Sequence, residues 1–139
     1  MIRAETTAAA QHVAVIGLGY IGLPTAAILA SGGADVTGMD VNQRTVDFVN
    51  EGKVPFVEPD LGTVLAGAVS QGRLRATTEV PAAGAYIVAV PTPFKGDHQP
   101  DLSYIRTAAE SIAPHLTGGE LVILESTSPP PAPPTSWPR

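Results

Sequence analysis

The chain has no cysteine, few basic residues and no long apolar segment. Without cysteine no disulfide is possible. Lys and Arg number 8 against 13 Asp and Glu, a net charge of −5, and they form no basic patch, so nucleic acid is not an expected partner. No apolar run is long enough to cross a bilayer, and the first residues lack the hydrophobic core of a secretory signal. These absences predict a soluble cytoplasmic protein that contacts no membrane.

Short apolar runs alternate with longer helical stretches along the chain. Strands alternating with helices form βαβ units, which build a parallel sheet with right-handed crossovers. We therefore predict an α/β fold, a Rossmann-type doubly wound parallel sheet in one truncated domain over residues 11–127, with a disordered segment at 1–10. The expected strands are 12–17, 34–40, 74–77, 85–90 and 120–126, and the expected helices are 20–33, 42–50, 59–72 and 101–113. Asn42 is expected to cap the helix at 42–50.

Two of these elements carry specific expectations about burial. The run at 120–126 is apolar enough to be a buried strand. In the helix at 101–113, the spacing of Leu102, Ile105, Ala109 and Ile112 predicts that these four residues face inward.

The segment "GLGYIG" places glycines at 17, 19 and 22, between the first strand and the first helix. In that position Gly17 permits a tight turn, Gly19 lets the backbone approach a pyrophosphate, and Gly22 allows close packing of helix on strand. The first N–H groups of the helix, near Tyr20 and Ile21, would then face the phosphates with the helix dipole behind them. The alternative is that these glycines only form a turn.

Asp40 ends the second strand, eighteen residues beyond Gly22. A carboxylate there accepts hydrogen bonds from the ribose hydroxyls of adenosine and repels a 2′-phosphate, which favours NAD over NADP. Arg44, one helical turn later, is a second candidate contact, either to a phosphate or stacked on adenine. The alternative for Asp40 is a solvated strand end.

Four segments together resemble the UDP-glucose/GDP-mannose dehydrogenase family over about residues 12–130. They are "VIGLGYIGLPTA", "EPDL", "VAVPTPFKGDHQPDLSYI" and "ILESTSPP". The loop with Pro91, Phe94 and residues 95–98 is most similar to the branch of that family that acts on UDP-N-acetyl-D-mannosamine. The resemblance implies the oxidation of a sugar-nucleotide CH₂OH to a carboxylate with two NAD⁺.

The resemblance also implies that much of the enzyme lies outside this chain. In the family, a cysteine, a lysine and an asparagine of a linking helix and second domain carry the chemistry, and the full-length enzymes are homo-oligomers. Here no catalytic residue of that kind is present, so we expect an NAD-binding N-terminal portion that is inactive alone, with a UDP-sugar as partner of the full-length enzyme only. The last strand is then expected to leave a sheet edge and an apolar helix face uncovered.

By resemblance, Thr92 of "PTP" and Ser126 and Thr127 of "EST" lie beside the nicotinamide. Their hydroxyls are able to hydrogen-bond the cofactor or orient a water molecule, which gives Thr92 an assisting role. The local alternatives are that Thr92 orders a turn between two prolines and that Ser126 and Thr127 cap the following segment.

Three further residues have two interpretations each. Lys95 either meets a diphosphate or lies in solvent, and His98 either touches the substrate or is one of the histidines that loops collect without chemistry. Glu125 ends the fifth strand and either belongs to the active cleft or emerges into solvent. No spacing of His, Asp and Glu suggests a metal site.

Residues 128–139 hold six of the fourteen prolines and look non-native after a core strand. One hypothesis is a reading-frame error, because the codons of residues 131–135 read two bases later permit Gly-Thr-Thr-Asp, which is similar to the family's continuation. A second is a non-catalytic dinucleotide-binding module whose Pro-rich tail docks on a partner as polyproline II. A third, a small dehydrogenase active as a dimer, is disfavoured because no base or nucleophile lies outside the cofactor loops.

Overall fold

The computed structural model describes residues 12–91 and 102–125. The strands are β1 (His12–Ile16), β2 (Asp35–Met39), β3 (Leu74–Thr77), β4 (Ala85–Val88) and β5 (Leu121–Leu124). The helices are α2 (Gly22–Ser31), α3 (Gln43–Asn50), α4 (Leu61–Ser70) and α5 (Ser103–Ile112), and a short 3₁₀ turn, η2 (Ala113–His115), follows α5.

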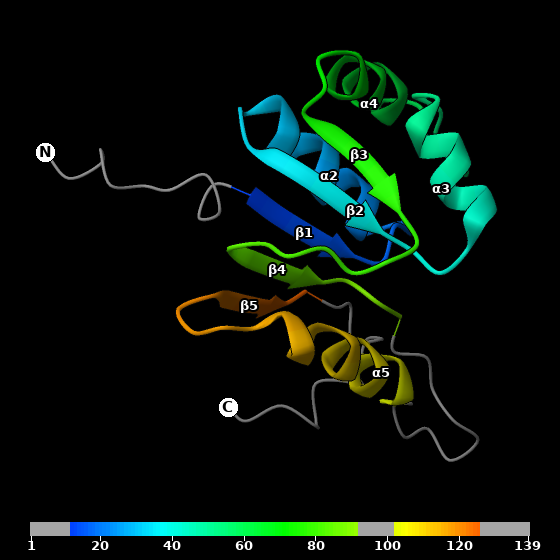
Figure 1. Ribbon diagram of the computed structural model, residues 1–139. Helices are drawn as coiled ribbons and strands as arrows, with labels where there is room; N and C mark the ends of the chain where they lie inside the picture. The colour runs from blue at the N-terminus through cyan, green and yellow to red at the C-terminus, as the bar shows by residue number, and fades with distance from the viewer. Residues whose placement is uncertain (1–11, 92–101, 126–139) are drawn as a thin grey trace, which may run out of the picture.

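The five strands form one sheet in the order β3-β2-β1-β4-β5, and all four pairings are parallel. The chain therefore starts in the middle of the sheet, builds one half outward through β2 and β3, and returns to build the other half through β4 and β5 (Figure 1). This order, with its reversal next to β1, is that of the dinucleotide-binding α/β fold, and it confirms the predicted Rossmann-type, doubly wound sheet.

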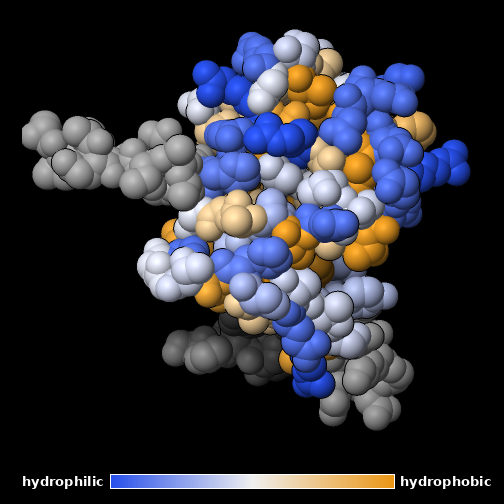
Figure 2. All heavy atoms as spheres, in the orientation of Figure 1, coloured by the Kyte–Doolittle hydropathy of each residue, from blue (hydrophilic) through white to orange (hydrophobic). Residues whose placement is uncertain are grey.

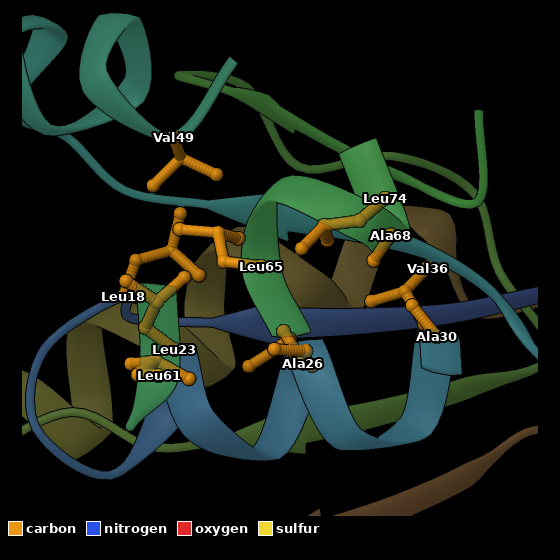
Figure 3. Close-up of a cluster of buried hydrophobic side chains, with 12 residues drawn as sticks. Leu18, Leu23, Ala26, Ala30, Val36, Val49, Leu61, Leu65, Ala68 and Leu74 are labelled. Carbon is orange, nitrogen blue, oxygen red and sulfur yellow. The ribbon is translucent and has the colours of Figure 1, made fainter. Parts of the chain in front are cut away.

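Helices cover both faces of the sheet, and each face has its own core. Val15, Val36 and Leu74 point to the face covered by α2 and α4, where Leu65 and Ala68 of α4 pack with Leu23, Ala26 and Ala30 of α2 (Figure 3). On the opposite face, Ala14, Ile16, Tyr86 and Val88 pack with Ala108 and Ile112 of α5. The alternation of Ala14, Val15 and Ile16 between the two cores is the period-2 pattern of a strand that is covered on both faces.

The predicted elements are all present, and each is one to four residues shorter than predicted, apart from β3, which has the predicted bounds. Asn42 caps α3 as predicted, because its side chain accepts hydrogen bonds from the N–H groups of Arg44 and Thr45. The predictions for residues 1–10 and 128–139 lie outside the described residues.

The burial predicted for β5 was wrong, and the inward face predicted for α5 was right for Ile112 only. All four residues of β5 are exposed, from 41% at Ile123 to 58% at Leu121, because β5 is the edge of the sheet and no described element covers it. On α5 the buried residues are Ala108 and Ile112, whereas Leu102 and Ala109 are exposed and Ile105 is half-buried. The helix is rotated about one residue from the predicted face, because it packs toward β4 and the loop at Ala83 rather than over β5.

The exposed strand β5 contributes to an apolar hollow beside α5. Val122 and Leu124 line a hollow of about 170 Å³ together with Ile105, Ile112 and Leu116. The predicted uncovered sheet edge and helix face are therefore both present in the described part of the chain. The face shown in Figure 2 is mostly hydrophilic, with hydrophobic side chains at its surface in separate patches. None of the described helices is long and apolar enough to cross a membrane.

Candidate cofactor-binding site

The candidate site lies at the edge where the strands end. Gly17 follows β1 and its N–H donates to the carbonyl of Met39, while Asp40 follows β2 and its N–H donates to the carbonyl of Thr77. Ala89 and Glu125 follow β4 and β5 in the same manner. Because the sheet is parallel, these four residues lie along one edge, and ligands of open α/β sheets bind outside the carboxyl ends of the strands.

Gly17 and Gly22 are required by close packing of the loop. Gly17 has a φ of 101°, and a Cβ there would lie 2.7 Å from the carbonyl oxygen of Ala89. A Cβ on Gly22 would lie 1.7 Å from the carbonyl oxygen of Gly17. Neither position has room for a side chain, so the turn from β1 into α2 depends on both glycines.

Gly19, unlike Gly17 and Gly22, has room for a side chain. No atom lies within 4 Å of the place that its Cβ would take. No side chain caps the start of α2, the N–H of Leu23 donates to the carbonyl of Gly19, and Pro24 has no N–H. The main-chain N–H groups of Tyr20, Ile21 and Gly22 are therefore the donors that this end of the helix offers to a ligand or to water. The open space above Gly19 beside these donors fits a bound pyrophosphate.

Asp40 is tied to the loop by its side chain. Its Oδ2 accepts a hydrogen bond of 2.9 Å from the N–H of Leu18, and its Oδ1 accepts one of 2.9 Å from the N–H of Asn42. A carboxylate has about four acceptor sites, so each oxygen keeps capacity for a ribose hydroxyl. Gly38 supports the same arrangement, because a Cβ there would lie 2.6 Å from the side chain of Leu18.

A cleft of about 1060 Å³ joins these features. Its size is at the upper end of ligand pockets, as a dinucleotide needs. On the β2 side it is lined by Asp40, Val41, Asn42 and Thr45 and by Pro55 and Phe56; at the centre by Gly17, Leu18, Gly19, Tyr20 and Ile21; and on the far side by Ala89, Val90, Pro91, Tyr104, Thr107, Ser111 and Glu125.

The cleft includes residues that the sequence analysis did not single out. The rings of Tyr20 and Phe56 are 4.4 Å apart between centroids, so the connection between α3 and α4 closes over the glycine loop. Thr107 and Ser111 of α5 add hydroxyl groups to the far wall. Phe56 stands between Val54 and Val57 in a short apolar stretch of this connection, which is the sequence signal that could have pointed to it.

The predicted site residues fall into three groups. Gly17, Gly19, Tyr20, Ile21, Gly22 and Asp40 lie together at the loop, all but Gly22 lining the cleft. The guanidinium of Arg44 lies over the ring of Phe48, 5.8 Å from its centroid, and Arg44 does not line the cleft, where Thr45 stands instead. Thr92, Lys95, His98, Ser126 and Thr127 lie outside the described residues.

Glu125 lines the cleft rather than emerging into solvent. Its carboxylate accepts hydrogen bonds from Oγ1 of Thr25, at 2.9 and 3.1 Å to its two oxygens. Thr25 is in the first turn and a half of α2, so the end of the last strand is joined to the first helix across 100 residues. The charge of Glu125 thereby lies close to the positive end of that helix.

The model of the UDP-glucose/GDP-mannose dehydrogenase family, NAD binding domain, matches residues 11–135. The chain belongs to this family. The matched part of the family is its NAD-binding domain, and the glycine loop, Asp40 and the cleft are the candidate site for that cofactor.

Among curated relatives, the chain is 61% identical over 117 residues to UDP-N-acetyl-D-mannosamine dehydrogenase of Salmonella typhimurium, covering 84% of this chain and 28% of the relative. It is 59% identical over 119 residues to NDP-N-acetyl-D-galactosaminuronic acid dehydrogenase of Ralstonia nicotianae, covering 86% of this chain and 28% of the relative. The chain therefore spans little more than a quarter of the length of these family members and corresponds to their NAD-binding portion.

Solved structures show the same relationship. UDP-N-acetyl-mannosamine dehydrogenase of Staphylococcus aureus superposes with a TM-score of 0.81 at 41% identity, over 84% of this chain and 28% of that one. GDP-mannose dehydrogenase of Pseudomonas aeruginosa superposes with a TM-score of 0.79 at 34% identity, over 85% of this chain and 29% of that one. The described part of this chain thus has the fold of the family's NAD-binding domain.

Proposed function

We propose that this chain is the NAD-binding part of an oxidoreductase that converts the CH₂OH group of a UDP-sugar to a carboxylate with two NAD⁺. The observation that carries the proposal is Asp40, whose carboxylate holds the loop through Leu18 and faces the cleft beside the open space at Gly19. Relatives named for UDP-N-acetyl-D-mannosamine support that sugar.

In this proposal the chain's own residues bind and orient the cofactor. Asp40 accepts the adenosine ribose hydroxyls, and the N–H groups at Tyr20 and Ile21 hold the pyrophosphate at the start of α2. NAD, when bound, supplies the hydride acceptor. Thr92, Ser126 and Thr127 are proposed as further contacts on the nicotinamide side, and Arg44 as a contact on the adenosine side.

The chemistry beyond NAD binding is assigned to the remainder of a longer enzyme. The 139 residues contain no cysteine, so the nucleophile that the resemblance to the family implies is not among them. We therefore expect no turnover by this chain alone. A cytoplasmic location and a homo-oligomeric full-length enzyme stay predictions.

Calorimetric titration of the purified chain with NAD and with NADP tests the binding proposal. NAD is expected to bind at least tenfold more tightly, about 1.4 kcal/mol, because a 2′-phosphate meets the Asp40 carboxylate. Equal binding of both, or tighter binding of NADP, contradicts it.

An activity assay tests the assignment of the chemistry. The chain with NAD and UDP-N-acetylmannosamine or UDP-glucose is expected to form no NADH above background. Turnover that survives repurification would show that the catalytic group lies within these residues.

A further inference from the structure

Glu125 has a position in the cleft that the proposed binding of NAD leaves without a role. Asp40 follows β2 and Glu125 follows β5, and in the order β3-β2-β1-β4-β5 these strands are three places apart. At about 4.8 Å between neighbouring strands, the two carboxylates lie on the order of 14 Å apart along the edge. The start of α2, after β1, lies between them.

A dinucleotide has its pyrophosphate in the middle and a nucleoside at each end. With the pyrophosphate at the start of α2 and the adenosine ribose at Asp40, the second nucleoside lies on the other side of β1, at the ends of β4 and β5. Glu125 lines that part of the cleft. In NAD this second nucleoside carries the nicotinamide ring, which is a cation when oxidised and neutral when reduced.

The carboxylate of Glu125 is held in place, and no basic side chain of the described residues pairs with it. Thr25 Oγ1 donates to its carboxylate, and its own N–H donates to the carbonyl of Val88 at 2.8 Å. Within residues 12–91 and 102–125, the ion pairs join His12 and Arg75 to Asp35 and Lys53 to Glu51, and none includes Glu125. A single hydroxyl proton leaves most of the carboxylate's acceptor sites for a ligand.

We propose that Glu125, positioned by Thr25, is the residue that makes this site bind oxidised NAD⁺ in preference to NADH. The inference rests on the proposed NAD binding. The carboxylate attracts the positive nicotinamide ring and gains nothing from the neutral ring, whereas all other parts of the two cofactors are identical. The attraction between two opposite unit charges about 6 Å apart in a partly solvated cleft is strong enough to give a three- to tenfold preference for NAD⁺. An enzyme that uses two NAD⁺ in sequence gains from this, because NADH leaves and NAD⁺ rebinds between the two oxidations.

The test compares three ligands, NAD⁺, NADH and ADP-ribose, by calorimetry on the unaltered chain and on Glu125→Gln. The glutamine keeps an oxygen that accepts from Thr25 and removes the charge. We expect the ratio of the NADH and NAD⁺ dissociation constants to fall about three- to tenfold in Glu125→Gln, while ADP-ribose, which lacks the nicotinamide ring, binds within about twofold of the unaltered chain. Glu110→Gln removes an equal charge from α5 outside the cleft and is expected to leave the ratio unchanged.

Each other outcome has a distinct meaning. An unchanged ratio in Glu125→Gln, or equal weakening of all three ligands, overturns the inference, since a purely structural role affects the three alike. If the variant does not fold, the salt dependence of the ratio in the unaltered chain decides: screening should lower it, and a ratio independent of salt overturns the inference. If the unaltered chain binds none of the three ligands, the proposed NAD binding itself fails and the inference falls with it.

Discussion

The main-chain N–H of Leu18 donates a hydrogen bond of 2.9 Å to Oδ2 of Asp40. The side chain at the end of β2 therefore holds the loop at the end of β1 in place. A second bond, from the N–H of Asn42 to Oδ1, fixes the carboxylate itself. The shape of the glycine loop thus depends on the same residue to which we assign recognition of the ribose.

Substitution of Asp40 is expected to affect both cofactor affinity and cofactor choice. Asp40→Ala removes the charge and both hydrogen bonds, whereas Asp40→Asn removes the charge but keeps one oxygen as an acceptor. We expect both variants to lose most of the preference for NAD over NADP, with Asp40→Asn binding NAD more tightly than Asp40→Ala. Calorimetry with both cofactors measures this, and exposed Asp47→Asn on α3 is the charge control. A preference that stays tenfold in Asp40→Ala would contradict the assignment of this residue.

The loop glycines are expected to separate stability from binding. In Gly22→Ala the new methyl group meets the carbonyl oxygen of Gly17, so the variant should lose about 3 kcal/mol of folding free energy or fail to fold. In Gly19→Ala the methyl group enters open space, so stability should change by less than about 1 kcal/mol while NAD binds at least about tenfold more weakly. Urea unfolding and calorimetry on the two variants measure these effects. Tight NAD binding by a folded Gly19→Ala would show that the pyrophosphate does not lie there.

Glu120 is expected to produce an acid-dependent step in stability. The N–H groups of Thr117 and Gly118 and the hydroxyl of Thr117 donate to its carboxylate and lower the pKa of Glu120 from 4.5 to about 2. A lowered pKa in the folded state gives stability that is present above pH 4.5 and is lost as the pH falls toward 2. The protection factors of the Thr117 and Gly118 amides, which correct for the slower intrinsic exchange in acid, should fall on acidification across this range.

Glu120→Gln supplies the comparison for that step. It should remove the fall in protection between pH 4.5 and 2, whereas Glu110→Gln on α5, which loses the same charge without touching this turn, should keep it. An unchanged pH dependence in Glu120→Gln would show that the carboxylate does not hold the turn.

The exposed edge at β5 is expected to limit the solubility of the isolated chain. Leu121 and Ile123 are 58% and 41% exposed on a strand with an open edge, and such edges pair with other chains unless charged residues interrupt them. Replacing both with lysine should raise the highest concentration at which the chain stays monomeric by light scattering. Ile28→Lys, on α2, replaces a residue that is 63% exposed but not on an edge strand, and it should have little effect. An equal gain from Ile28→Lys would assign the effect to net charge alone.

The alternation of apolar runs, the three glycines and the capping Asn42 were sufficient to predict the order of elements and the phosphate loop. These signals are local, since a helix cap, a tight turn and a period of two or 3.6 residues each involve neighbours in sequence. Asp40 was also predictable, because its spacing from Gly22 follows from the length of one βα unit.

The features that were missed depend on contacts between distant segments. The exposure of β5 could not be read from its composition, because an apolar run looks the same at the centre and at the edge of a sheet. Ala108 rather than Ala109 is buried on α5, since the helix packs toward Tyr86 and Ala83 rather than over β5. The hydrogen bonds from Leu18 to Asp40 and from Thr25 to Glu125 span 22 and 100 residues, and no local sequence pattern predicts them.

Thr25 and Glu125 are far apart in the sequence, so the two ends of the cleft are synthesised at different times. The loop at Gly19 and its partner Asp40 leave the ribosome first, followed by Pro55 and Phe56, which complete the wall of the cleft on the β2 side. Glu125 follows Asp40 by 85 residues (125 minus 40), about 4 to 17 seconds later at about 5 to 20 residues per second. In the assignments proposed above, a nascent chain that has reached β3 already carries the residues for the adenine nucleotide half of the cofactor, before the carboxylate that distinguishes the oxidised form from the reduced one has been made.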